Sequence, residues 1–235
     1  MRRSITPFAI TLLLAATCTA FGAGGGPSPA SSPAMQTREA PTPETLARNA
    51  YNAGVRSVEK ADELIAGAAR QTDERKQKKV RAKAEHAYAT AMKKFASATE
   101  LQPSNYQAWN YLGYTNRKVG NYEAALSAYD RALKLKPGFA EAIEYRGHAY
   151  LHLNRLSEAK DAYLTLFSGN RQLAATLLAA MQHWVGEHRA ASSNKDGAGA
   201  DGAMVESFAS WVNERSTIAG QTASLTREGA AAAWH

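Results

Sequence analysis

The sequence predicts an all-α fold built from successive helical hairpins. Alanine, which has the highest helix propensity, occurs 48 times in 235 residues. Beyond Pro43 the apolar residues recur with the period of a helix and do not alternate as they would in a strand. Helix-stopping residues interrupt this pattern at a regular interval. Pro103 and Pro137, for example, lie 34 residues apart. A repeat of that length accommodates two helices, which indicates a solenoid of α-hairpins.

Residues 1–22 have the pattern of a signal peptide. Two arginines precede a short apolar stretch from 8 to 16, and small residues follow it. Because a membrane-spanning helix needs roughly 20 apolar residues, this stretch is too short to span a membrane in the mature protein. We therefore expect a periplasmic or secreted protein, with a lipid anchor on Cys18 as the alternative. Residues 23–43 are rich in Gly, Pro, Ser and Ala, which predicts a disordered linker.

A helical repeat domain is predicted over residues 44–185. It begins with a long hairpin whose helices lie near 44–68 and 73–101. Two further units follow, starting at Tyr106 and Ala140. Each has a glycine where helices approach closely, then an alanine and a tyrosine in its second helix: Gly113, Ala125 and Tyr129 in one, and Gly147, Ala159 and Tyr163 in the other. Gly120 and Asn154 supply left-handed turns between the paired helices.

The chain resembles the tetratricopeptide repeat family in these units. The residues that carry the resemblance in the second unit are Trp109, Leu112, Gly113, Ala125, Tyr129, Ala132 and Pro137. The resemblance covers roughly residues 44–167. It implies a solenoid of about two and a half to three repeats, in an exported bacterial protein.

The C-terminal region is predicted to cap the repeats. Residues 171–185 form an amphipathic pattern typical of a capping helix. A flexible loop is expected over 186–203, a short docking helix over 204–218, and a disordered tail over 219–235.

The family resemblance implies an interaction scaffold whose ligand lies in a concave groove lined by first helices. The implied groove positions share one helical face and have no part in packing: Gln107, Asn110, Tyr114, Arg117, Lys118, Glu141, Glu144, His148 and His152. Mixed charges and aromatic rings on this face suit a peptide or a partner protein. A solvated face without a partner is the alternative interpretation. The set lacks the repeated Lys and Asn pattern with which some relatives clamp a terminal carboxylate.

A basic run lies in the second predicted helix. Six of nine consecutive residues are basic: Arg75, Lys76, Lys78, Lys79, Arg81 and Lys83. This run predicts either a solvated helix extension or a surface for anionic lipid or polysaccharide. We do not expect nucleic acid as the partner, because no aromatic side chains are interleaved with the charges.

The sequence offers no catalytic motif. It contains no nucleophile elbow, phosphate-binding loop or His-Glu-x-x-His pair. His148 and His152 share a helix face, but no third residue at matching spacing completes a metal site. We therefore predict a protein that is not an enzyme and has no metal or cofactor. The expected function is an exported cell-envelope scaffold that binds a peptide or partner protein, with a surface binder acting through residues 75–83 as the alternative.

Overall fold

The computed structural model describes residues 40–193 and 200–232, and in these ranges the chain folds into eight helices without a strand. The helices in chain order are α1 (Pro43–Ala68), α2 (Glu74–Leu101), α3 (Tyr106–Lys118), α4 (Tyr122–Leu135), α5 (Ala140–His152), α6 (Leu156–Gly169), α7 (Arg171–Ser193) and α8 (Ala200–Ala232). All belong to one compact unit that begins at Pro41. The predicted all-α hairpin fold is confirmed.

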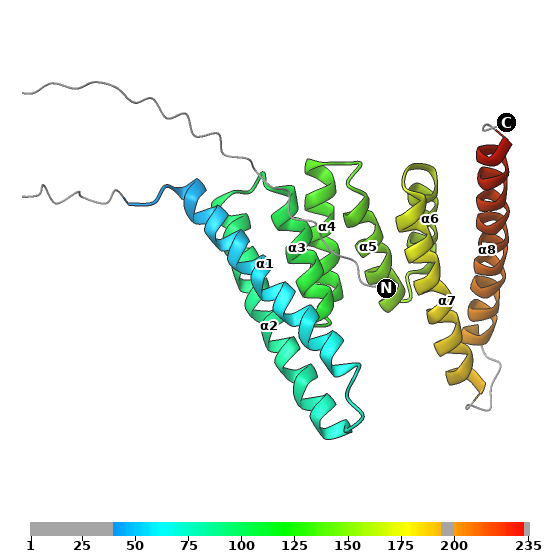
Figure 1. Cartoon of the computed structure of the whole chain (residues 1–235), viewed down its shortest axis with the longest axis horizontal. Helices are drawn as coiled ribbons and strands as arrows, with labels where there is room; N and C mark the ends of the chain where they lie inside the picture. Colours follow the sequence, from blue (N-terminus) through cyan, green and yellow to red (C-terminus); the bar gives the residue numbers. More distant parts are fainter. Residues whose placement is uncertain (1–39, 194–199, 233–235) are drawn as a thin grey trace, which may run out of the picture. The chain divides into compact units, whose positions relative to one another are not determined.

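Neighbouring helices pack in pairs, and the pairs pack on one another. Within the pairs, α1 lies against α2, α3 against α4, α5 against α6, and α7 against α8. Between pairs, α2 lies against α3, α4 against α5, and α6 against α7 (Figure 1). Each second helix therefore covers the first helix of the following hairpin, which is the arrangement expected for a solenoid.

Local sequence signals explain where the helices begin and end. Thr42, Asp73 and Asn105 are N-caps whose side chains accept hydrogen bonds from backbone N–H groups of the first turn, at 3.3, 3.1 and 2.9 Å. The two turns inside hairpins use the left-handed residues predicted for them, Gly120 at φ 86° and Asn154 at φ 56°. The two helices of the first hairpin start within one residue of the predicted positions.

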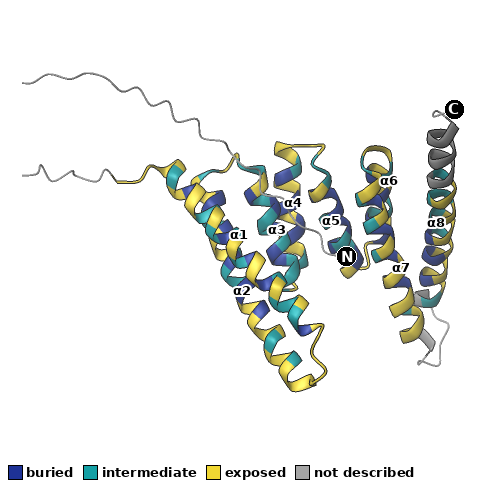
Figure 2. Ribbon diagram, viewed as in Figure 1, coloured by how far each residue is buried: buried dark blue, intermediate teal, exposed yellow. Residues whose placement is uncertain are grey.

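Glycine allows the helices of a hairpin to approach a neighbouring side chain closely. A Cβ atom on Gly113 would lie 2.5 Å from the ring of Tyr129, and one on Gly54 would lie 2.7 Å from the ring of Phe95. Both rings are fully buried. Figure 2 shows that buried residues recur along the described helices. The space beside each of these two glycines is thus filled by an aromatic ring of the second helix. At Gly147 the neighbour is Leu177 of α7, at 2.6 Å.

The C-terminal helices are longer than predicted. The expected loop over 186–203 is helical at both ends, because α7 continues to Ser193 and α8 starts at Ala200, and residues 194–199 lie outside the described ranges. The expected tail from 219 is helical as far as Ala232. An ion pair of 2.6 Å between Arg189 and Glu206 joins α7 to α8, and Ala219 packs against the apolar core. These contacts extend helices that the local sequence would leave unsupported.

Three sequence predictions fall outside the described residues: the signal peptide, the alternative lipid anchor on Cys18, and the linker apart from its last residues. Among the helices described, none has the length and apolarity to cross a membrane.

Candidate functional site

The C-terminal half of α3 brings tyrosines from three hairpins together. The ring of Tyr114 lies 6.2 Å from that of Tyr88 in α2 and 5.2 Å from that of Tyr145 in α5, measured between centroids. Tyr114 donates a hydrogen bond of 3.1 Å to Asp62 of α1, and Tyr88 donates a second one to the same carboxylate oxygen. Asp62 thus ties the first hairpin to the second. Burial is the main cause that raises the pKa of the Tyr88 and Tyr114 hydroxyls.

Two cations lie against these rings. The Arg117 guanidinium is 5.4 Å from the ring centroid of Tyr114 and 5.5 Å from that of Tyr145. The Lys118 ammonium is 5.0 Å from the ring centroid of Tyr88. These distances are within the range of cation–π attraction.

The charges of Arg117 and Lys118 are not neutralised by a contacting carboxylate. Among the described residues neither forms an ion pair, and the buried Nε of Arg117 has no hydrogen-bond partner there. Burial, followed by the nearby Arg117 charge, lowers the pKa of Lys118, and the Asp62 charge opposes this effect. A half-buried cation pair held by aromatic rings can receive an acidic group from a ligand at little conformational cost.

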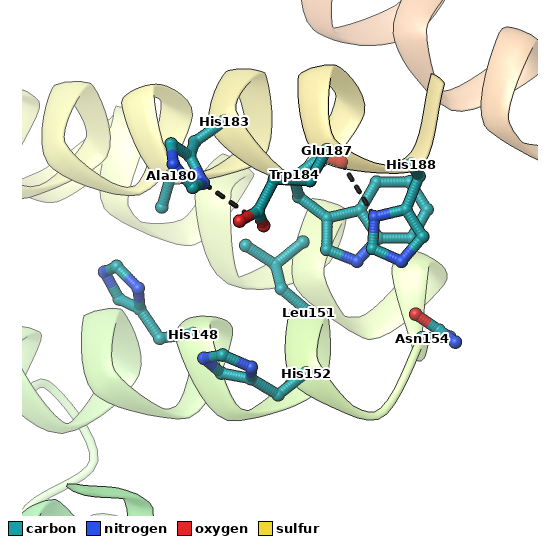
Figure 3. Close-up of a pocket in the computed structure, with 9 residues that line it drawn as sticks. All are labelled: His148, Leu151, His152, Asn154, Ala180, His183, Trp184, Glu187 and His188. Carbon is teal, nitrogen blue, oxygen red and sulfur yellow. Dashed lines mark hydrogen bonds and ion pairs between the residues drawn. The ribbon is translucent and has the colours of Figure 1, made fainter. Parts of the chain in front are cut away.

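A pocket of about 410 Å³ lies between α5 and α7. The cation pair lies on α3, the first helix of the preceding hairpin. Figure 3 shows His148 and His152 on α5 facing His183, Trp184 and His188 on α7. All four imidazoles, those of His148, His152, His183 and His188, line one pocket.

The polar contacts of the pocket come from both helices. Nε2 of His148 is 3.3 Å from Glu144, and Nδ1 of His183 is 3.3 Å from Glu187. The ring of His188 stacks on Trp184 at 3.7 Å between centroids. His152 stacks on Tyr122 of α4 at 4.5 Å. The pocket therefore offers aromatic faces together with imidazole donors and acceptors to a ligand.

Five of the predicted groove residues lie at these two places. Arg117 and Lys118 form the cation pair and lie over the ring of Tyr114. His148 and His152 line the pocket. Gln107 and Glu141 are exposed in the first turns of α3 and α5.

The other two predicted groove residues are not open to a ligand. Asn110 and Glu144 are only 5% and 3% exposed. The helical spacing placed them on the groove face, but it does not show how closely α3 and α5 approach each other, and these two helices are in contact.

Sequence reasoning missed the contributions of Asp62, Tyr88 and all of α7. Asp62 lies in the C-terminal half of α1, which is twice as long as α3, so the groove positions of a 34-residue repeat do not extend to it. The pattern of α7 indicated a cap, although the helix also takes the place of a first helix beside α5.

The basic run lies on the surface of α2. Its six residues are all exposed on the first turns of α2: Arg75, Lys76, Lys78, Lys79, Arg81 and Lys83. Lys76 makes a long ion pair of 3.9 Å with the N-cap Asp73. Nowhere in the ranges that the structure describes do three or more His, Cys, Asp or Glu residues form a group that could hold a metal ion.

The fold and site define an α-hairpin repeat protein with an aromatic and cationic face on its first helices. The family model for the tetratricopeptide repeat matches residues 106–139, so the chain contains a repeat of that family and the resemblance seen in the sequence is confirmed.

Two of the solved structures that are similar to this chain are tetratricopeptide domains. One is the second tetratricopeptide domain of human RPAP3, solved with an HSP70 peptide; it is 20% identical with a TM-score of 0.37, and the match covers 54% of this chain and 95% of that one. The other is the first such domain of Spaghetti (RPAP3), bound to an HSP90 peptide; it is 22% identical with a TM-score of 0.38, covering 54% and 94%.

Proposed function

We propose that this protein is an exported scaffold that binds a peptide or a segment of a partner protein along α3, α5 and α7. One observation carries the proposal: Arg117 and Lys118 are positioned by three tyrosine rings and have no ion-pair partner among the described residues. A buried or half-buried charge without a partner is costly, so such an arrangement favours a ligand that supplies an acidic side chain.

The pocket between α5 and α7 would hold a neighbouring side chain of the same ligand. Its lining of Trp184, Leu151 and four imidazoles suits an aromatic or polar side chain rather than a long aliphatic one. Binding would then depend on shape and charge, and no bond would be made or broken. Export is supported by the signal-peptide pattern of residues 1–22 and places the partner outside the cytoplasm.

The test is a comparative affinity purification with the full chain. Extracts of cells that express the protein are passed over the wild type, the double variant Arg117→Gln/Lys118→Gln, and the control Lys134→Gln. Lys134 is an exposed lysine in the last turn of α4, and the cations over the rings of Tyr88, Tyr114 and Tyr145 are Arg117 and Lys118. Proteins that bind the groove should be enriched on the wild type and the control and depleted about tenfold on the double variant.

Thermal unfolding of the three proteins shows whether each is folded. If the double variant is folded and still captures the same proteins in the same amounts, the groove is not the binding surface.

A second candidate function is binding to anionic lipid or polysaccharide, which the exposure of all six basic residues of the run 75–83 favours. Attraction of this kind is screened by salt, so sedimentation with anionic vesicles should fall steeply between about 0.02 and 0.3 M salt. Binding that does not change with salt would argue against it.

A further inference from the structure

The first helix of each later hairpin is covered by a helix from the preceding hairpin. Val119, which follows α3, packs on the buried cluster of α2 around Ala84 and Tyr88. Leu153, which follows α5, packs on the buried cluster around Ala125 and Tyr129 of α4. These contacts repeat because the hairpins repeat.

The corresponding position on α1 has no such cover. Gly54, Gly113 and Gly147 occupy the same position in the three hairpins. Val119 and Leu153 follow their glycines at the same spacing. The residue at that spacing after Gly54 is Lys60. Lys60 is exposed. Among the described residues no helix precedes α1. The outward side of the first hairpin therefore has no covering helix among the described residues, and we call this uncovered side the seat.

A pocket marks this seat. It has a volume of about 840 Å³ and lies between α1 and α2, lined by Lys60 and Leu64 of α1 and by Lys79, Ala82, Lys83 and His86 of α2, among others. Aliphatic groups contribute most of its surface, and its charged side chains are three lysines, with no carboxylate in the lining. The seat therefore combines an apolar floor with a basic rim.

The apolar side continues along α1. Leu46 is 41% exposed and precedes Leu64 by 18 residues, which is five turns of a helix, so the two lie on the same side. Their separation along the axis is roughly 27 Å. A partner helix of about 18 residues would span this distance.

We propose that the outward side of α1 and α2 docks an acidic amphipathic helix from a partner protein. A helix suits this side because Leu46 and Leu64 lie on the same side of α1, five turns apart. The apolar stripe of the partner would cover Leu46 and Leu64, and its flanking carboxylates would meet Lys60, Lys79 and Lys83. Exposed ion pairs contribute little free energy each, so the apolar contact gives affinity while the charges select the partner. This surface is separate from the groove on α3, α5 and α7.

Two occupants from this chain fit less well. Residues 1–39 contain three arginines and one acidic residue, Glu39, so they do not complement a basic rim. A second copy would have to offer an acidic helix face. On α8 the carboxylates of Glu206 and Glu214 are already paired with Arg189 and Arg215, each at 2.6 Å.

The test uses the full chain and a fluorescent synthetic peptide of about 18 residues, whose helix carries a leucine stripe flanked by glutamates. Fluorescence anisotropy should show saturable binding. A scrambled peptide of the same composition, which keeps the charge but loses the stripe, should bind at least about tenfold more weakly. A third peptide with lysine in place of glutamate should not bind.

Variants of the protein locate the binding. Lys60→Glu/Lys83→Glu should weaken binding of the peptide at least about tenfold. The matched control is Lys78→Glu, because Lys78 is exposed on the same helix, next to Lys79, but does not line the pocket. It should change binding less than about twofold. The groove variant Arg117→Gln/Lys118→Gln should bind the peptide as the wild type does, so a failure of the groove proposal would leave this result unchanged.

Four results would overturn the proposal. The peptide could fail to bind, the scrambled peptide could bind equally well, or Lys78→Glu could weaken binding as much as the pocket variant. The fourth is a different occupant: anionic vesicles that bind while the peptide does not, or self-association in sedimentation that is lost in Lys60→Glu/Lys83→Glu.

Discussion

The contact between Gly113 and Tyr129 leads to a quantitative prediction for the variant Gly113→Ala. The added Cβ would lie 2.5, 2.6 and 2.9 Å from three atoms of the Tyr129 ring, whereas carbon atoms in contact are normally about 3.5–4.0 Å apart. Tyr129 is fully buried and cannot swing aside. Overpacking of a core typically costs about 1–3 kcal/mol, and this contact belongs at the upper end. Alanine recovers about 1 kcal/mol of helix propensity, which leaves a net loss of about 2 kcal/mol.

The control is Gly67→Ala, because a Cβ at Gly67 of α1 meets nothing within 4 Å. That variant should gain up to about 1 kcal/mol from helix propensity. Thermal unfolding followed by circular dichroism should therefore show Gly113→Ala melting about 4–8 °C below the wild type and Gly67→Ala slightly above it. In a Tyr129→Leu background the cost of Gly113→Ala should largely disappear. Equal melting temperatures for the two alanine variants would refute the close-approach argument.

Three further predictions concern Asp62, the turns and pH. Tyr88→Phe removes one of two hydroxyl donors to Asp62 and should lower the free energy of unfolding by about 1–3 kcal/mol, measured by urea titration. Gly120→Ala should cost about 1–2 kcal/mol because its φ is 86°, while Asn154→Gly should leave the urea midpoint unchanged or raise it. Burial, then the charges nearby, lowers the pKa of His152, so the unfolded chain takes up the proton first and stability should fall as the pH drops below about 6.5. His152→Gln should flatten that decline in urea midpoints measured between about pH 7.5 and 5.5, and an unchanged slope would contradict it.

The hairpins could be predicted because their signals are local. Pro103, Gly120, Pro137 and Asn154 punctuate the chain at turns, and the small and aromatic residues between them fix the register of the repeat. The fold follows from these positions without knowledge of distant contacts.

The C-terminal helices could not be predicted in the same way. Glycine and serine near 186–203 favour a loop locally, but the ion pair between Arg189 and Glu206 and the packing of Trp184 on Phe208 hold α7 and α8 together. Such tertiary contacts override local propensity and leave no periodic trace in the sequence.

The candidate site, like the fold, could be predicted where its residues are close in the sequence and not where they are distant. Helical spacing placed Tyr114, Arg117 and Lys118 on one face, where the structure also has them close together. It could not show that Asp62, 52 residues before Tyr114, accepts the hydrogen bond of its hydroxyl. Contacts between residues this far apart depend on how hairpins stack, which the pattern of one hairpin does not contain.

The central claim is that a partner binds along the first helices of the second and third hairpins. The most direct measurement is hydrogen exchange of the full chain, alone and in complex with a partner recovered by affinity purification. The account predicts slower exchange in residues 114–118 of α3 and 148–152 of α5, with no change over the exposed side of α4. Protection confined to α4 and α6, with α3 and α5 exchanging as in the free chain, would contradict it.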